Sequence, residues 1–349
     1  MTAAWMLLAS VLASAQSKPN PKPVTCASCH QAEAFAQSTS QMAHALQLPG
    51  SNQVLAAHPK LTYRKGAYSY SVETHNGKSV YSVTDGTQTI TLPIGWAMGA
   101  QAQTWVLERN GQMYESLVSF YPLINGLGIT TGDESLSPKT LDEAVGRPVS
   151  KEEAKTCFNC HATHAVFDHN LDFATMKAGV TCERCHTDAD AHLMAILADA
   201  KTIPTPAKIG QPSTEDMSNF CGQCHRTWET AVRSHWRGEA DVRFQPYRLA
   251  NSRCYNGDDA RISCVACHDP HGKIVRDTAS YDTKCLACHS SAALAVATTS
   301  ATTPHPKACP VAKSNCASCH MPKVALPNGL MKLTDHQIRV VRPNEPYPN

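Results

Sequence analysis

The sequence is poor in the residues that build a large conventional core. Aromatic residues make up only 6% of its 349 positions, and 22 prolines and 18 glycines would interrupt long helices and strands. A core of ordinary side chains would therefore be thin, unless a bound group supplied further apolar surface. Beyond the amino-terminal residues the sequence has no apolar run long enough to cross a bilayer, so we expect no membrane-spanning helix.

The amino-terminal residues are typical of an export signal. Residues 3–13 are apolar, and Ala13, Ser14 and Ala15 are small residues of the kind that a signal peptidase reads. We expect cleavage after Ala15, so residues 1–15 are predicted to be a signal peptide, although the basic residues that usually begin one are missing. Residues 16–25 are rich in proline and indicate an extended tether. The protein is therefore expected to be secreted, either to the periplasm or out of the cell.

Cysteine is abundant, and nearly all of it occurs in one arrangement. The pattern Cys-x-x-Cys-His appears seven times and uses 14 of the 16 cysteines. A zinc site or a redox dithiol needs the two cysteines only, whereas attachment of a c-type haem also needs the histidine that follows. With 17 histidines in the chain, seven chance copies have odds of roughly one in 10⁹. We therefore expect seven covalently bound c-type haems, each with one iron.

The spacing explains the chemistry of each motif. Two sulfurs would bond the porphyrin, and the adjacent histidine would bind the iron from the same side. In chain order, motifs 1 to 7 are Cys26–His30, Cys157–His161, Cys182–His186, Cys221–His225, Cys264–His268, Cys285–His289 and Cys316–His320. The predicted attachment residues are Cys26, Cys29, Cys157, Cys160, Cys182, Cys185, Cys221, Cys224, Cys264, Cys267, Cys285, Cys288, Cys316 and Cys319. The predicted proximal iron ligands are His30, His161, His186, His225, His268, His289 and His320.

Charge argues against one class of partner. The formal net charge is +2 at pH 7, which by itself indicates no special partner. Each ferric haem with ionised propionates would add about −1, so the loaded protein would carry about −5 and become more negative on reduction. An acidic protein is repelled by a phosphate backbone, so we expect no binding to nucleic acid.

Ten further histidines are available for the second face of the irons. A second imidazole on each iron would give saturated, low-spin haems of the kind that pass electrons. His271 follows His268 too closely to reach round a porphyrin to the same iron, so it should bind the iron of a neighbouring haem. The same argument applies to His192, which follows His186. The predicted distal ligands are His44, His58, His192, His235, His271, His305 and His336.

Two of these predictions leave alternatives open. His44 follows His30 by 14 residues on an expected helix over residues 32–46. This would place it about 21 Å along the axis, at a different haem. Met42 is its rival, because methionine also binds haem iron. His164 is the rival of His58.

Two cysteines stand outside the motifs. Cys254 and Cys309 each precede a motif closely enough to meet if those haems are neighbours. In an exported protein a disulfide is the default for such a pair, and two free thiols are the alternative. Near Cys254, guanidinium groups of Arg243 and Arg248 suit haem propionates through bidentate bonds, although ordinary exposed arginine is equally consistent.

The pattern of elements divides the chain at residue 150. Residues 26–150 are predicted to hold the first haem motif and a β-rich region, and residues 151–349 a six-haem region of helices and loops. In the first region, Asn-Gly pairs at residues 76–77 and 110–111 separate alternating strands, which is a strong hairpin signal. A loop is expected over residues 136–150.

The predicted fold is therefore that of a multihaem cytochrome c. We expect mostly short α-helices and loops around stacked haems, with a small antiparallel β-sheet insertion near residues 60–122. The sheet would cover one end of the haem array, and docking of a partner is the alternative role for it.

Several stretches resemble a known group of proteins. "CASCHQAEAFAQSTSQMAHAL", "GVTCERCHTDADAH", "RFQPYRLANSRCY", "ISCVACHDPHG" and "CASCHMPK" followed by "TDHQIRV" resemble exported multihaem cytochromes c of the doubled-CxxCH type. These are related to the tetrahaem cytochromes that accept electrons from hydroxylamine oxidoreductase. The resemblance implies electron transfer and packed haem pairs. It also implies bis-histidine ligation by His44, His192, His235, His271 and His336.

Three functions are weighed on these observations. The first is electron transfer along a chain of bis-histidine haems, between redox protein partners or from a membrane quinol-linked donor. The second is a multihaem oxidoreductase with one open haem for nitrite, hydroxylamine or a sulfur oxyanion, but the sequence lacks a CxxCK motif and has spare histidines. The third is a homo-oligomer, as a subunit of an extracellular haem filament. We expect the electron-transfer protein, with no catalytic residue.

Overall fold

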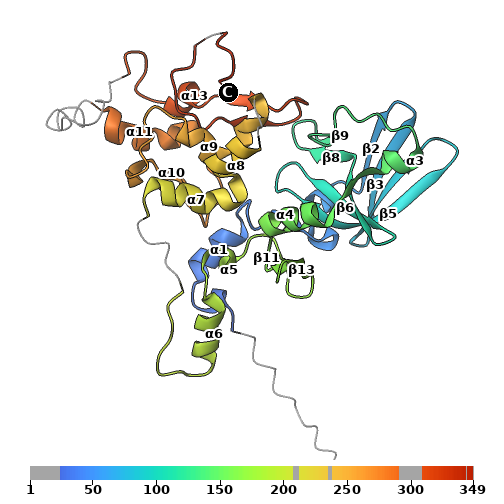
Figure 1. Cartoon of the computed structure of the whole chain (residues 1–349), viewed down its shortest axis with the longest axis horizontal. Helices are drawn as coiled ribbons and strands as arrows, with labels where there is room; N and C mark the ends of the chain where they lie inside the picture. Colours follow the sequence, from blue (N-terminus) through green and yellow to red (C-terminus); the bar gives the residue numbers. More distant parts are fainter. Residues whose placement is uncertain (1–23, 207–211, 235–237, 291–308, 343, 349) are drawn as a thin grey trace, which may run out of the picture.

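The computed structural model describes residues 24–206, 212–234, 238–290, 309–342 and 344–348. The predicted signal peptide, most of the tether, and the histidines at positions 235 and 305 lie outside the described residues. Among the described helices, none has the length and apolar character needed to cross a bilayer. Figure 1 shows a large sheet on one side of the molecule and most of the helices on the other, with the helix α4 (Lys151–His161) between them.

The β-region is an eight-stranded antiparallel sheet in the order β10-β7-β6-β5-β4-β3-β2, with β1 paired to β5. Its strands are β1 (Leu46–Gln47), β2 (Lys60–Lys65), β3 (Tyr68–His75), β4 (Lys78–Thr84), β5 (Thr89–Met98), β6 (Thr104–Arg109), β7 (Gln112–Ser116) and β10 (Gly146–Val149). The prediction of mostly short helices around stacked haems, with a small sheet insertion, is therefore wrong. The sheet is a major part of the fold, and it reaches well beyond residues 60–122.

The error has a physical cause at the two ends of the sheet. β1 has two residues and β10 reads Gly-Arg-Pro-Val, so neither shows the alternation by which a strand is recognised. Residues 136–150, expected to be a loop, instead contain the helix α3 (Leu141–Val145) and β10, which pairs with β7. The inner strands are different, because their hairpin signals are explicit in the sequence.

Both predicted hairpins are confirmed. His75 pairs with Lys78 across the first turn, and Arg109 pairs with Gln112 across the second. The Asn and Gly of each turn have positive φ, at 51° and 73° in the first and 53° and 75° in the second. These values at both central residues define the type I′ turn that matches the twist of paired strands.

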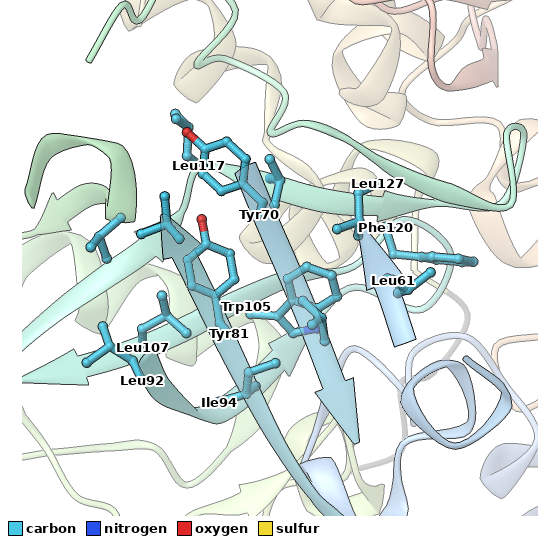
Figure 2. Packing of buried hydrophobic residues seen from close by; sticks show 14 of the residues in the cluster. Leu61, Tyr70, Tyr81, Leu92, Ile94, Trp105, Leu107, Leu117, Phe120 and Leu127 are labelled. Atoms are coloured by element: carbon cyan, nitrogen blue, oxygen red, sulfur yellow. The ribbon is translucent and has the colours of Figure 1, made fainter. Parts of the chain in front are cut away.

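One face of the sheet buries the largest hydrophobic cluster. Along β4, the buried residues Ser79, Tyr81 and Val83 alternate with half-buried or exposed ones. Figure 2 shows the rings of Tyr70, Tyr81 and Trp105 packed among leucines of neighbouring strands. The strands β8 (Val118–Tyr121) and β9 (Gly126–Ile129) form a two-stranded sheet whose Phe120 and Leu127 belong to the same cluster. The aromatic side chains, few overall, are thus concentrated where they build a conventional core.

The remaining elements are short. The α-helices include α1 (Gln31–Ser38), α2 (Gln53–Ala57), α5 (Cys182–Cys185), α6 (Ala189–Leu197), α7 (Thr214–His225), α8 (Trp228–Arg233), α9 (Gln245–Ala250), α10 (Cys264–Cys267), α11 (Asp282–His289) and α13 (Cys316–His320). The 3₁₀ helices are η1 (Cys26–Ser28), η2 (Pro49–Ser51), η3 (Gly238–Arg243), η4 (Ala260–Ile262) and η5 (Thr278–Tyr281). Two-residue strands pair as β11 (Ala162–Thr163) with β14 (Lys177–Ala178) and β12 (Val166–Phe167) with β13 (Asn170–Leu171), and β15 (Lys323–Ala325) pairs with β16 (Lys332–Thr334).

Capping residues set where the motif-bearing helices begin. Ser150 precedes α4, and its hydroxyl accepts a hydrogen bond from the Glu153 amide. The Ser150 amide donates in turn to the Glu153 carboxylate, and these two bonds form a capping box. Ser213 caps α7 through the amide of Asp216. The helix expected over residues 32–46 is shorter, because α1 ends at Ser38. The predicted distance along its axis to His44 therefore does not apply.

Candidate haem-attachment sites

All seven motifs lie at or within short helical turns, and this explains their spacing. Motifs 2, 4, 6 and 7 form the last turns of α4, α7, α11 and α13. Residues at positions i, i+3 and i+4 of a helix share one face. The two cysteines and the histidine have this spacing, so the turn directs both sulfurs and the imidazole to the same side. The His186 amide closes such a turn on the Cys182 carbonyl at 2.8 Å.

Two of the predicted proximal imidazoles are oriented by backbone carbonyl groups. The Nδ1 atom of His161 lies 2.9 Å from the Ala45 carbonyl oxygen, and that of His320 lies 2.8 Å from the Arg339 carbonyl oxygen. An Nδ1 facing a carbonyl oxygen must carry the proton, so the lone pair remains on Nε2. Metal-binding histidines are typically held in this way by their other ring nitrogen.

Two of the predicted distal ligands have the same arrangement. Nδ1 of His192 lies 2.8 Å from the Pro204 carbonyl oxygen, and Nδ1 of His336 lies 3.0 Å from the Thr334 carbonyl oxygen. His58 differs, because its Nδ1 bonds to the Val54 carbonyl and its Nε2 to the Asn125 side chain, both at 2.9 Å. In this structure His58 therefore has no free nitrogen for a metal.

Two pairs of imidazole rings have nearly the same separation. The ring centroids of His186 and His271 are 6.1 Å apart with an interplanar angle of 9°, and those of His268 and His336 are 6.2 Å apart at 49°. Two metal–imidazole bonds of about 2.0 Å, plus about 1.1 Å from each nitrogen to its ring centre, add to about 6 Å. Each pair therefore has a separation that would suit two ligands of one haem iron, and each consists of a predicted proximal histidine and a predicted distal one.

The surroundings keep the second pair in the neutral form. Burial lowers the pKa of His336 to about 4, and the nearby imidazole of His268 adds to the effect. Burial also lowers the pKa of His268. Since neutral imidazole is the form that binds a metal, both rings are ready for ligation at pH 7.

The residues at the motifs fit a c-type haem. Paired thiols, an available Nε2 atom and a facing imidazole are the donors that such a group requires. Large apolar side chains stand exposed close to the motifs, among them Phe35 at 73%, Val265 at 43% and Ile274 at 45% of their surface. Exposed apolar patches indicate a binding surface, and a porphyrin has a matching apolar face. When bound, haem supplies one-electron chemistry at its iron.

The motifs also lie against one another, and motif 4 has three neighbours. From motif 2, the Cys160 thiol lies 3.7 Å from the Gln223 carbonyl oxygen and interacts with the thiol of Cys224. From motif 3, Arg184 reaches Cys224 at 4.0 Å. From motif 5, Cys264 interacts with the thiol of Cys221.

Further contacts link the outer motifs to these. Cys26 of motif 1 interacts with Cys182 of motif 3. At the other end, Asp282 begins α11, the helix that ends in motif 6. Both of its carboxylate oxygens accept from backbone amides at motif 7, including that of Cys316 at 2.8 Å. The ring of Tyr281 contacts that of His268 in motif 5, with centroids 5.5 Å apart. The described motifs thus form one connected array.

The other predicted residues are placed as follows. His44 and Met42 lie in the turns after α1, where the Val180 amide donates to the Met42 carbonyl at 3.0 Å and holds this segment beside motif 3. Figure 1 shows α1 and α5 close together in the same place. His164 lies in a bend beyond motif 2 with a positive φ of 56°. Cys254 and Cys309 are both free and exposed in this structure, and their pairing stays a prediction.

One suggestion from the sequence does not hold. Arg248, proposed as a contact for haem propionates, is buried and bonds to the carboxylate of Asp335 instead. No sequence pattern indicates this partner, which lies 87 residues further along the chain. The backbone carbonyls that orient the imidazoles could not have been found from the sequence either, because every residue has one.

Among the described residues, no group of three or more histidine, cysteine, aspartate or glutamate side chains is arranged to hold a lone metal ion. Residues 132–187 match the family model of cytochrome c554 and c-prime. The matched segment contains motifs 2 and 3 in full. It supports a c-type cytochrome, with c-type haem as cofactor and electron transfer as role. No curated protein and no solved structure matches the chain.

Proposed function

We propose that this cytochrome binds seven haems and passes electrons along them between redox partners outside the cytoplasm. The match to the family model supports the cytochrome itself. The observation that carries the finer proposal is the pair of imidazole gaps at 6.1 and 6.2 Å. Saturated irons have no open position for a substrate, so this geometry favours electron transfer over catalysis at those two irons.

The connected array of motifs supports conduction. Electrons pass between haems that lie close together, and each contact between motifs brings two covalently anchored haems near each other. The potential of each iron would be set by its ligands, its hydrogen bonds and its burial. The donor would be a redox protein or a quinol-linked membrane protein, and contact through an exposed haem edge would suffice.

The first experiment counts haems and their spin states. Mass spectrometry of the mature exported protein should give seven haem additions and the loss of residues 1–15. Electron paramagnetic resonance of the oxidised protein should show low-spin signals. An intense high-spin signal, together with nitrite binding that displaces no ligand, would favour the oxidoreductase. Light scattering measures the oligomeric state and so tests the filament hypothesis. A monomer in which every haem is six-coordinate would contradict that hypothesis.

Ligand variants test the imidazole pairs directly. His271→Ala and His336→Ala should each convert one low-spin haem to a high-spin haem that binds carbon monoxide when reduced. His75→Ala is the matched control, because His75 is exposed at the end of β3 beside a hairpin turn. If both variants keep the spectrum of the unaltered protein, the bis-histidine ligation proposed here is wrong.

A further inference from the structure

The segment that carries His336 is held in place by a buried ion pair. We call residues 334–339 the ligand segment. Its Asp335 is fully buried, and its carboxylate accepts from Nε and Nη2 of Arg248 at 2.9 and 3.0 Å. This is the bidentate geometry of an arginine fork on a carboxylate, which fixes orientation as well as distance. Arg248 lies on α9, and only 1% of its side chain is exposed.

The other contacts of Arg248 tie the same region together. Its Nη2 also donates to the Gln337 side chain at 2.6 Å, and its Nη1 to the Pro348 carbonyl at 2.9 Å. The guanidinium lies 4.5 Å from the ring centre of Tyr347. The three nitrogens of this guanidinium donate to Asp335, Gln337 and Pro348, so a single side chain links these parts of the described carboxyl-terminal region.

Backbone contacts carry this constraint to His336 itself. The Ser252 hydroxyl, just after α9, donates to the His336 carbonyl at 3.2 Å and accepts from the Ile338 amide at 2.8 Å. With Asp335 bound on one side and Ile338 on the other, the backbone of His336 has little freedom to move. The centre of its ring then lies 6.2 Å from that of His268.

The ligand segment also reaches a second motif. The Arg339 amide donates to the His320 carbonyl at 3.2 Å, and the Arg339 carbonyl accepts from Nδ1 of His320 at 2.8 Å. Arg339 in turn donates to Asp335 through its own guanidinium. The same ion pair therefore supports two histidines: His336, the predicted ligand near motif 5, and His320, the predicted proximal ligand of motif 7.

A buried ion pair is a costly way to gain stability. Removing two charges from water is unfavourable, and replacing a buried ion pair by apolar residues of similar volume often leaves a protein as stable or makes it more stable. The geometry of this pair therefore points to a role in fixing position. An arginine fork holds a carboxylate in one orientation, whereas apolar packing would let the segment shift.

We propose that Arg248 is a positioning residue, which through Asp335 sets the place of His336 opposite His268 and the orientation of His320. This inference rests on the proposed function, because it requires those histidines to bind haem iron. It assigns a role to Arg248 that is different from contact with a propionate, and it concerns two irons of the array.

The test compares three variants. Arg248→Lys keeps the charge and loses the fork. The double variant with Arg248→Met and Asp335→Leu replaces the pair by apolar groups, which should preserve folding. Arg253→Lys is the matched control, since Arg253 lies exposed a few residues away. Each protein is checked for seven haem additions by mass spectrometry and then measured by electron paramagnetic resonance, potentiometric titration and carbon monoxide binding to the reduced form.

We expect both Arg248 variants to keep their haems and to gain carbon monoxide binding at about one or two haems in seven, with shifted low-spin signals and potentials for the same haems. The control should match the unaltered protein. Unchanged signals in both Arg248 variants would overturn the proposal. His336→Ala, measured in parallel, separates the two failures. If His336→Ala creates a high-spin haem while the Arg248 variants keep the signals of the unaltered protein, only the positioning role is wrong. If His336→Ala also keeps those signals, ligation by His336 is wrong, and the positioning role is wrong with it.

Discussion

The carboxyl of Asp133 should make the stability of the protein depend on pH in an unusual direction. Asp133 is only 6% exposed, and its Oδ2 atom has no hydrogen-bond partner among the described residues. Burial raises its pKa from 3.8 to about 6; the nearby Glu115 carboxylate adds to the rise, and Arg147 opposes it. The folded protein therefore binds the Asp133 proton more tightly than the unfolded chain does.

The sign and the magnitude follow from linkage. Where the folded state binds more protons than the unfolded state, the free energy of unfolding falls as pH rises. The loss begins above the unfolded pKa near 3.8 and is complete once pH has passed about 6. At about 1.36 kcal/mol for each pH unit between the two values, the cost at pH 7 is about 2–3 kcal/mol.

Replacing Asp133 by asparagine removes the titration and keeps the shape. The variant's free energy of unfolding, relative to the unaltered protein, should rise by about 2–3 kcal/mol between pH 4 and pH 7. Denaturant titrations followed by far-ultraviolet circular dichroism at several pH values measure this difference. Asp258→Asn, at an exposed position, is the matched control. A difference for Asp133→Asn that stays constant across this range would refute the reasoning.

Two further predictions concern packing. Leu107→Ala, at a fully buried position of β6 in the main cluster, should lower the free energy of unfolding by about 2–5 kcal/mol. The control Leu123→Ala, at a 61% exposed position, should change it by less than about 0.5 kcal/mol. Equal losses of stability in denaturant titrations would contradict the core described above. Gly179 has a φ of +76°, and a Cβ there would lie 2.0 Å from the Ala43 carbonyl oxygen. Gly179→Ala should therefore lower the thermal midpoint more than Gly66→Ala, because Gly66 has a φ of +60° with nothing within 4 Å; similar midpoints would mean that the contact is unimportant.

The sequence was most informative where a short local signal fixes the structure. The two Asn-Gly turns predict their hairpins because positive φ at both central residues is available to few residue types. The helix α4 begins at a capping box formed by Ser150 and Glu153, which are three residues apart in the sequence. In each case the decisive residues are neighbours in the chain.

It was least informative where the decisive partner is distant. β10 becomes a strand only because β7 offers it a free edge, and its own four residues indicate nothing. The sequence around Arg248 is consistent with an exposed arginine or with a contact to a haem propionate, whereas the structure shows it paired with Asp335. The closeness of His271 to His186 could be anticipated only in part, since chain spacing predicted that His271 would not share an iron with His268 but did not identify its neighbour.

Motif 4 contacts motifs 2, 3 and 5, and this position has a consequence for the routes that electrons could take through the protein. In a linear series every inner member lies on the single route, whereas a site that is joined only to the junction, as motif 2 is to motif 4 in the contacts above, lies off it. If haems occupy these sites, an electron reaching motif 4 would have more than one exit, and charge arriving by one branch could be stored on another until an acceptor docks. Damage at motif 2 would then leave a through route, while damage at motif 4 would divide the molecule into isolated parts.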